Sequence, residues 1–213
     1  MLAWVIDVVL HLDRHLLELL TRYELWIYPI LFAVIFAETG LVVTPFLPGD
    51  SLLFAVGALA AVDRTGTLQA PLASVTLGVA AVLGNTVNYS IGRAIGPPAF
   101  SGRYRLLKIQ YLRRTEEFFR RYGAMAILVS RFVPIIRTCA PFVAGVGRMP
   151  YARFLAYNLA GGFAWVLLFV WGGYLFGNIP FVKQHFGLVT LLVIAVSLVP
   201  LAGALWRRRA PAE

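Results

Sequence analysis

Four ionisable side chains stand within long apolar stretches of the sequence: Glu38, Asp50, Arg131 and Arg137. A charge at the centre of a membrane costs roughly 2.5–3.5 kcal/mol on insertion scales, so such residues usually mark a site for ions or substrate. The guanidinium group of arginine is a planar fork of donors that binds phosphate bidentately and keeps its charge. We therefore predict that Arg131 and Arg137 bind an anionic substrate and that Glu38 and Asp50 couple its binding to protons.

A purely structural role is the alternative for these four residues. Two salt bridges between carboxylates and arginines would pin apolar segments together without binding any substrate. The two interpretations are compatible, because an ion pair that partly neutralises itself can open to admit a ligand. We favour the functional interpretation, since ionisable groups at membrane depth are functional by default.

Prolines interrupt both of the segments that carry these charges. An unbroken helix would place Arg131 and Arg137 on different faces, and a break at Pro134 could turn both toward one site. The other predicted breaks are at Pro45, Pro48, Gly49 and Pro141. Broken backbone is not tolerated against lipid, so these segments must be buried in protein or line an aqueous cavity. The pattern predicts two re-entrant helical hairpins, at 25–62 and 123–149.

The composition requires a membrane around these hairpins. Of the 213 residues, 60% are hydrophobic and only 14% are charged, and the mean hydropathy is +0.77, which is too apolar for the surface of a soluble domain. Three stretches without Asp, Glu, Lys or Arg are long enough to span a hydrocarbon core, which takes roughly 20 residues. These stretches are 68–92, 154–182 and 186–206. We predict transmembrane helices at 68–96, 154–178 and 186–206, and hence an all-α membrane protein.

The two halves of the chain resemble each other. One shift along the sequence places Glu38 on Arg131 and Pro48 on Pro141, and each broken segment precedes a spanning helix that ends in Gly-x-x-x-Gly. Paired discontinuous segments in corresponding positions are typical of transporters built from inverted repeats. We predict a pseudo-symmetric inverted repeat whose hairpins have opposite orientations. The Gly-x-x-x-Gly pairs indicate close helix packing and leave a homodimer open.

The formal net charge of +9 indicates orientation in the membrane and not nucleic-acid binding. Basic residues concentrate in 97–122 and in the tail 207–213, and lysine and arginine accumulate in cytoplasmic segments. We therefore place both segments, and the C-terminus, in the cytoplasm. The first of them alternates basic and apolar residues, which predicts an amphipathic helix on the inner leaflet, with a partner-binding helix as the alternative. Residues 1–24 form either an interfacial segment or a first helix.

Three polar residues within the predicted spans are candidates to hold the charged side chains in place. Asn85, Tyr89 and Asn158 could stabilise the site, although hydrogen bonding between helices explains them equally well. The sequence has no phosphate-binding loop and no hydrolase or metalloprotease motif, and its three histidines fall in predicted surface segments. We therefore expect no enzymatic activity, no metal site and no cofactor.

Several ordered motifs together resemble the DedA family, also called SNARE-associated or VTT-domain proteins. The first is Glu38-Thr39-Gly40 followed by Pro45-Phe46-Leu47-Pro48-Gly49-Asp50-Ser51. The second is Phe118-Phe119-Arg120-Arg121-Tyr122-Gly123, then Ser130-Arg131-Phe132-Val133-Pro134 through Arg137, Ala140-Pro141 and Ala144-Gly145. Gly84-Asn85 and Tyr89-x-x-Gly92-Arg93 add to it, and the resemblance covers about residues 25–180.

This resemblance implies a multi-pass protein of the bacterial inner membrane with two opposed re-entrant hairpins. Family members are linked to proton-motive force and envelope homeostasis, and some are implicated in returning undecaprenyl phosphate across the membrane. The family's essential residues correspond to the four charged positions named above. The species of lipid does not carry over, because the family contains several activities.

Three functions follow from these features. The first is a lipid-phosphate translocase, for undecaprenyl phosphate recycling coupled to proton-motive force, whose partners are the bilayer and an anionic lipid. The second is a proton-coupled transporter of a small solute, which would need an enclosed polar pocket. The third is a membrane-homeostasis scaffold that transports nothing, for which the basic segment should matter more than Glu38.

Overall fold

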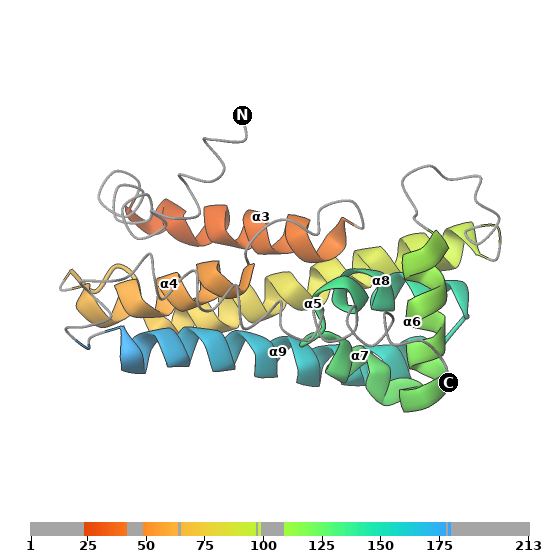
Figure 1. Ribbon diagram of the computed structural model, residues 1–213. Helices are drawn as coiled ribbons and strands as arrows, with labels where there is room; N and C mark the ends of the chain where they lie inside the picture. The colour runs from red at the N-terminus through yellow and green to blue at the C-terminus, as the bar shows by residue number, and fades with distance from the viewer. Residues whose placement is uncertain are drawn as a thin grey trace, which may run out of the picture. The chain divides into compact units, whose positions relative to one another are not determined.

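The computed structural model describes residues 24–41, 49–63, 65–96, 98, 109–177 and 179, and every regular element among them is helical (Figure 1). The helices are η1 (Glu24–Trp26), α3 (Ile27–Gly40), α4 (Gly49–Val62), α5 (Ala70–Ile95), α6 (Ile109–Tyr122), η3 (Gly123–Met125), α7 (Ala126–Ser130), α8 (Pro134–Val146) and α9 (Tyr151–Phe176). The predicted all-α class is therefore confirmed for this part of the chain.

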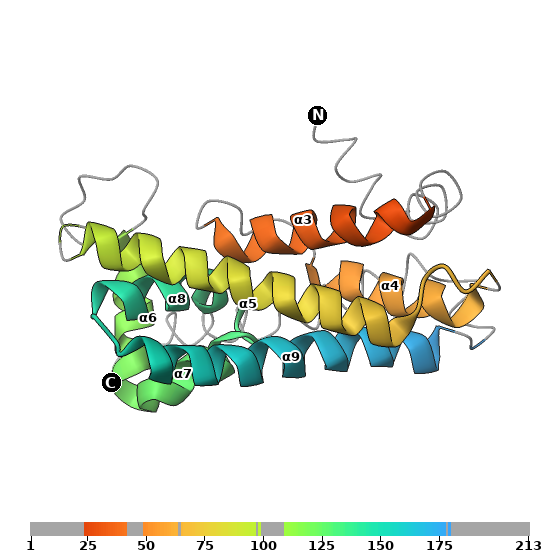
Figure 2. The ribbon, with the colours of Figure 1, turned by 180° about the vertical axis from the view of Figure 1, so that it is seen from behind.

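Two of these helices, α5 and α9, are long and apolar enough to cross a membrane. Each has 26 residues, or about 39 Å at the rise of an α-helix, and Figure 2 shows both as uninterrupted helices. They coincide with the predicted spans 68–96 and 154–178. The third predicted span, 186–206, lies outside the described residues, as do the N-terminal segment 1–23 and the tail 207–213.

Exposed apolar side chains follow one face of α5 at intervals of three and four residues. They are Leu72, Val75, Val79, Leu83, Val87 and Ile91, each more than a third exposed. A water-soluble helix would carry polar residues at such positions. Exposed apolar residues in this pattern are typical of a helix face that contacts lipid.

Helices α3, α4 and α8 are shorter, with 14, 14 and 13 residues. Helices of this length extend over about 20 Å, which is less than the roughly 30 Å of a hydrocarbon core. The first two correspond to the predicted hairpin 25–62. Of its predicted breaks, Pro45 and Pro48 lie outside the described residues, and Gly49 is the first residue of α4. Re-entrant insertion and the inverted repeat remain predictions.

The second broken segment differs from its prediction at one position. Helix α7 ends at Ser130, the backbone turns at Arg131, and α8 begins at Pro134, where the missing N–H of proline is not needed. The expected break at Pro141 is wrong, because α8 continues through this residue to Val146. A proline removes one helical hydrogen bond, and the packing of α8 in the fold tolerates this loss.

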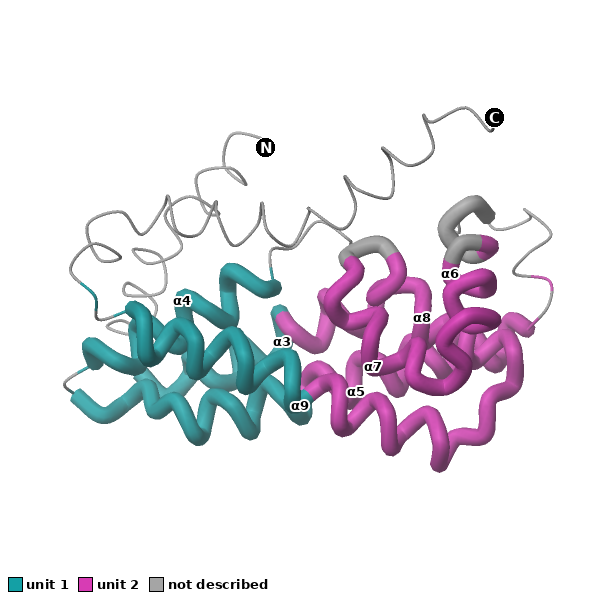
Figure 3. The backbone as a smooth tube through the Cα atoms, turned by 60° about the horizontal axis from the view of Figure 1, so that its bottom comes forward, with its two compact units in different colours: residues 1–34, 48–79, 163–196 teal, residues 35–47, 80–162, 197–213 magenta. Residues whose placement is uncertain are grey.

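The described chain divides into two compact units (Figure 3). Unit 1 includes residues 27–34 of α3, helix α4, residues 70–79 of α5 and residues 163–176 of α9. Here α4 and α9 cross at glycines: a Cβ on Gly57 would meet the carbonyl of Val170, and one on Gly173 would meet the carbonyl of Phe54. The phenol of Tyr28 ties α3 to the loop before α5, since it donates to Thr67 O at 3.1 Å.

Unit 2 includes residues 35–40 of α3, residues 80–95 of α5, helices α6, α7 and α8, and residues 151–162 of α9. Helices α5 and α8 also cross at glycines, because a Cβ on Gly92 would meet Phe142 O and one on Gly145 would meet Tyr89 O. Helix α6 packs on α8, with Phe119 set against buried residues of that helix. Part of the apolar face of the amphipathic segment is therefore covered by protein.

Candidate functional site

The centre of the candidate site in unit 2 is an ion pair between Glu38 and Arg137. Glu38 lies in the last turn of α3 and Arg137 in the first turn of α8, 99 positions further along the chain. A guanidinium nitrogen of Arg137 donates to Glu38 Oε1. The Glu38 side chain is 3% exposed and that of Arg137 is 16% exposed, so the pair is almost shielded from solvent. The break before Pro134 is what places Arg137 at the start of a new helix, opposite α3.

Arg131 lies in the turn that precedes α8. Its backbone N–H donates to Leu128 O, and the following N–H groups continue this tight turn. Its guanidinium donates to Asn158 Oδ1 at 2.9 Å, and the residue is only 5% exposed. Arg131 also interacts electrostatically with Glu38 and with Arg137. The structure thus brings three of the four predicted charged residues into one site.

A network of amide side chains holds Arg131 in place. Asn158 Oδ1 accepts from Arg131 and also from Asn85 Nδ2 at 2.9 Å, while Asn158 Nδ2 donates to Val82 O at 3.0 Å. These bonds connect α5, α9 and the turn before α8. They orient the guanidinium, and both asparagines are buried.

The third predicted support residue, Tyr89, has different partners. Its hydroxyl donates to Met149 O and accepts from Arg93 at 3.2 Å, and its ring stacks on Phe154 with centroids 4.4 Å apart. Tyr89 therefore anchors the end of the second broken segment to α5 and contributes to the packing of unit 2.

Two glycines that sequence reasoning missed make room for Arg131. A Cβ on Gly162 would lie 3.2 Å from a guanidinium nitrogen of Arg131, and one on Gly161 would lie 3.5 Å from its Cγ. The arginine side chain thus lies against the backbone of α9 at two residues that have no side chain. The consecutive glycines in the middle of a predicted span were the available signal, because glycine inside a helix often has a packing reason.

The fourth predicted residue, Asp50, belongs to unit 1. It lies in the first turn of α4, where a carboxylate is favoured by the helix dipole. Its Oδ1 accepts a hydrogen bond of 2.8 Å from the indole Nε1 of Trp165, a residue only 1% exposed. Sequence reasoning missed Trp165, because nothing in the pattern of α9 distinguishes it from the other aromatic residues of that helix.

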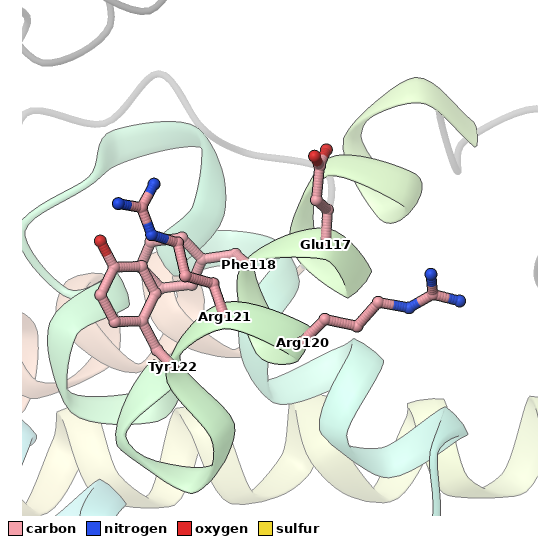
Figure 4. Close-up of a pocket in the computed structure, with 5 residues that line it drawn as sticks. All are labelled: Glu117, Phe118, Arg120, Arg121 and Tyr122. Atoms are coloured by element: carbon pink, nitrogen blue, oxygen red, sulfur yellow. The ribbon is translucent and has the colours of Figure 1, made fainter.

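A separate surface pocket lies on α6, in the predicted cytoplasmic segment. It is lined by Glu117, Phe118, Arg120, Arg121 and Tyr122. Figure 4 shows the two arginines directed away from each other, and the guanidinium of Arg121 lies over the Tyr122 ring, 5.5 Å from its centroid. This pocket contains none of the four predicted charged residues.

Comparison with known proteins extends these observations. Residues 47–175 match the model of the VTT domain, which is more than half of the chain. The chain belongs to the DedA family. Protein DedA of Escherichia coli (strain K12) is 48% identical over 201 residues, covering 94% of this chain and 91% of that protein. The resemblance inferred from the motifs is thereby confirmed.

Two further relatives are named as membrane proteins. Inner membrane protein YqjA of Escherichia coli (strain K12) is 36% identical over 191 residues, 86% of each chain. An uncharacterized membrane protein of Mycobacterium tuberculosis (strain ATCC 25618 / H37Rv) is 41% identical over 182 residues, 82% of this chain and 76% of that one. No solved structure matches the chain. With its two long apolar helices, this DedA-family chain is a membrane protein.

Proposed function

We propose that this DedA-family protein is a translocase for lipid phosphates of the bacterial inner membrane, with undecaprenyl phosphate as its cargo and proton-motive force as its energy source. The observation that carries the proposal is the buried pair of Glu38 and Arg137, together with a second buried arginine, Arg131, that is attracted by Glu38 and repelled by Arg137. The two arginines of this buried site carry two positive charges, and the single carboxylate of Glu38 neutralises only one of them. A phosphate headgroup supplies the negative charge that would balance both.

Charge balance gives the site a mechanism. With Glu38 ionised, the three charged groups of the site sum to one positive charge. When a phosphate monoester, which carries up to two negative charges near pH 7, binds both arginines, Arg137 leaves Glu38. An ionised carboxylate without its arginine partner is costly at membrane depth, so Glu38 takes up a proton. Two arginines, one phosphate dianion and a neutral Glu38 then form a neutral loaded site that can change its access between the two faces.

Asp50 supplies the second proton-binding carboxylate in this proposal. Its contact with the Trp165 indole gives it a fixed position in unit 1. The empty carrier is reset when Glu38 releases its proton, because the ionised carboxylate of Glu38 is then again the counter-ion of Arg137. The polyprenyl tail of the cargo stays in the bilayer throughout, so only the headgroup needs a polar path.

The test is flipping of a short-chain undecaprenyl phosphate analogue in liposomes that contain the purified protein. Arg131→Ala and Arg137→Ala should abolish flipping while the protein still inserts, and Glu38→Gln should remove the response to an imposed proton gradient. The matched control is Arg153→Ala, because this arginine of α9 is exposed and should leave the rate unchanged.

Two outcomes would count against the proposal. Wild-type protein that folds but moves no polyprenyl phosphate would exclude this lipid as cargo. Flipping of the uncharged alcohol or of a phosphodiester lipid at the same rate would contradict the role of the arginines, because neither offers the phosphate monoester that they are proposed to bind.

A further inference from the structure

Three residues of α5 at intervals of four, Gly84, Asn88 and Gly92, lie on one face of the helix in unit 2. Each of the two glycines lets another backbone approach α5. A Cβ on Gly84 would lie 2.8 Å from Phe36 O of α3, and one on Gly92 would meet Phe142 O of α8. The main chains of α3 and α8 therefore lie against α5 on either side of Asn88.

Asn88 donates to both of these main chains. Its Nδ2 makes hydrogen bonds of 3.3 Å to Thr39 O in α3 and of 3.0 Å to Thr138 O in α8. Thr39 directly follows Glu38, and Thr138 directly follows Arg137. The side chain is fully buried, so these bonds do not compete with water.

The chemistry of the amide group fixes this arrangement. An asparagine amide has two N–H donors, and here both are directed to carbonyl oxygens. A rotation of the amide by half a turn would set Oδ1 against those two carbonyls, which is repulsive. Within the part of the chain that the structure describes, Asn88 Oδ1 has no hydrogen-bond partner, which costs free energy. The two donated bonds therefore decide the orientation of the side chain.

We propose that Asn88 is a positioning residue for the Glu38–Arg137 pair: its amide ties together the backbone next to both partners and so sets the distance across which the pair closes and reopens. The consequence for transport rests on the proposed function of the pair. Asn88 does not contact the cargo. It acts through the two main chains that carry Glu38 and Arg137.

A double-mutant cycle tests this coupling. Asn88→Leu keeps a similar volume and removes both donors, and Glu38→Gln removes the ion pair. The thermal midpoint of the purified protein in detergent and the flipping rate of the short-chain polyprenyl phosphate are measured for wild type, both single variants and the double variant. Ser90→Ala is the matched control, because this serine of α5 is exposed and, among the described residues, its hydroxyl donates to Thr86 O of its own helix.

We expect Asn88→Leu to slow flipping about tenfold, as the loss of one to two net hydrogen bonds implies, and to lower the thermal midpoint less in the Glu38→Gln background than in wild type. Ser90→Ala should change neither quantity. Should Asn88→Leu prevent folding, Asn88→Ser, which keeps one donor, replaces it and should give a partial effect.

Equal shifts of the midpoint in the two backgrounds would overturn the proposal, because Asn88 would then act on helix packing alone. This outcome is distinct from failure of the proposed function. A wild-type protein that moves no lipid phosphate leaves the thermal cycle, and with it the coupling of Asn88 to the pair, fully measurable.

Discussion

The indole of Trp165 and the carboxylate of Asp50, 115 positions apart in the sequence, are joined by a hydrogen bond of 2.8 Å within unit 1. The bond connects the first turn of α4 to the buried face of α9. We propose that Asp50 binds protons, and the buried indole gives this carboxylate a rigid neighbour. The bond also suggests a way to separate the proton-coupling role of Asp50 from cargo binding.

The first prediction concerns this bond. Trp165→Phe keeps an aromatic ring but removes the donor, and a hydrogen bond to a charged group contributes about 1.5–3 kcal/mol. We expect the variant to flip lipid phosphate about tenfold more slowly and to respond weakly to a proton gradient, as Asp50→Asn should. The rate is measured in liposomes with and without the gradient. The control is Trp171→Phe, since Trp171 is 37% exposed. An unchanged gradient response in Trp165→Phe would show that the indole does not assist Asp50.

The second prediction separates the stability of the buried ion pair from its function. Removing one partner of such a pair costs about 3–5 kcal/mol, because the other charge stays buried, whereas replacing both is much less costly. Arg137→Gln should therefore be less stable than the double variant Glu38→Gln/Arg137→Gln, as measured by thermal unfolding in detergent. Neither should flip lipid phosphate. Transport by the double variant would reduce the pair to a structural role.

The third prediction concerns the crossing of α4 and α9. Gly57→Ala places a methyl group against the carbonyl of Val170, and overpacking of this kind costs about 1–3 kcal/mol. Gly172→Ala is the matched control, because a Cβ at this position of α9 meets no atom of the described residues within 4 Å and alanine favours helix. The thermal midpoint should fall for Gly57→Ala and stay or rise for Gly172→Ala. Equal midpoints would mean that the helices separate easily at this crossing.

The fourth prediction is a pH dependence in the loop between α4 and α5. Partial burial of the Asp63 carboxyl by itself raises its pKa. The carboxyl accepts hydrogen bonds from Leu68 N at 2.8 Å, from the Thr65 hydroxyl at 2.6 Å and from Thr65 N at 2.9 Å. These bonds outweigh the effect of burial, so the pKa is lowered from its ordinary value of 3.8. A lowered folded-state pKa stabilises the fold above the unfolded-state value, and this stabilisation is lost as the pH falls through the folded-state value.

Asp63→Asn should accordingly lower the thermal midpoint at pH 7, and the difference from wild type should shrink as the pH falls below 3.8. Thermal unfolding of both proteins across this range measures it. The effect should be small, because the loop is close to solvent. A difference that stays constant down to the acid limit would assign the loss to loop packing and not to the charge.

Much of the candidate site could be predicted from the sequence, because the cost of burying a charge in an apolar stretch is a local property. Glu38, Asp50, Arg131 and Arg137 stand out for that reason, as do the spans α5 and α9, whose length and composition decide their class. The break at Pro134 follows from the chemistry of proline. Pro141 could not be judged in this way, since packing around α8 decides whether a helix tolerates a proline.

The partners of these residues were decided only by tertiary structure. The sequence does not say that Glu38 pairs with Arg137 while Arg131 bonds Asn158, because side chains far apart in the chain meet only when helices cross at a particular register. Gly92 and Gly145 set one such register, since bare backbone lets α5 and α8 approach closely. Asn88 and Trp165 acquire their roles in the same way. Local chemistry determines which residues must be buried, and the crossing of helices determines what each of them contacts.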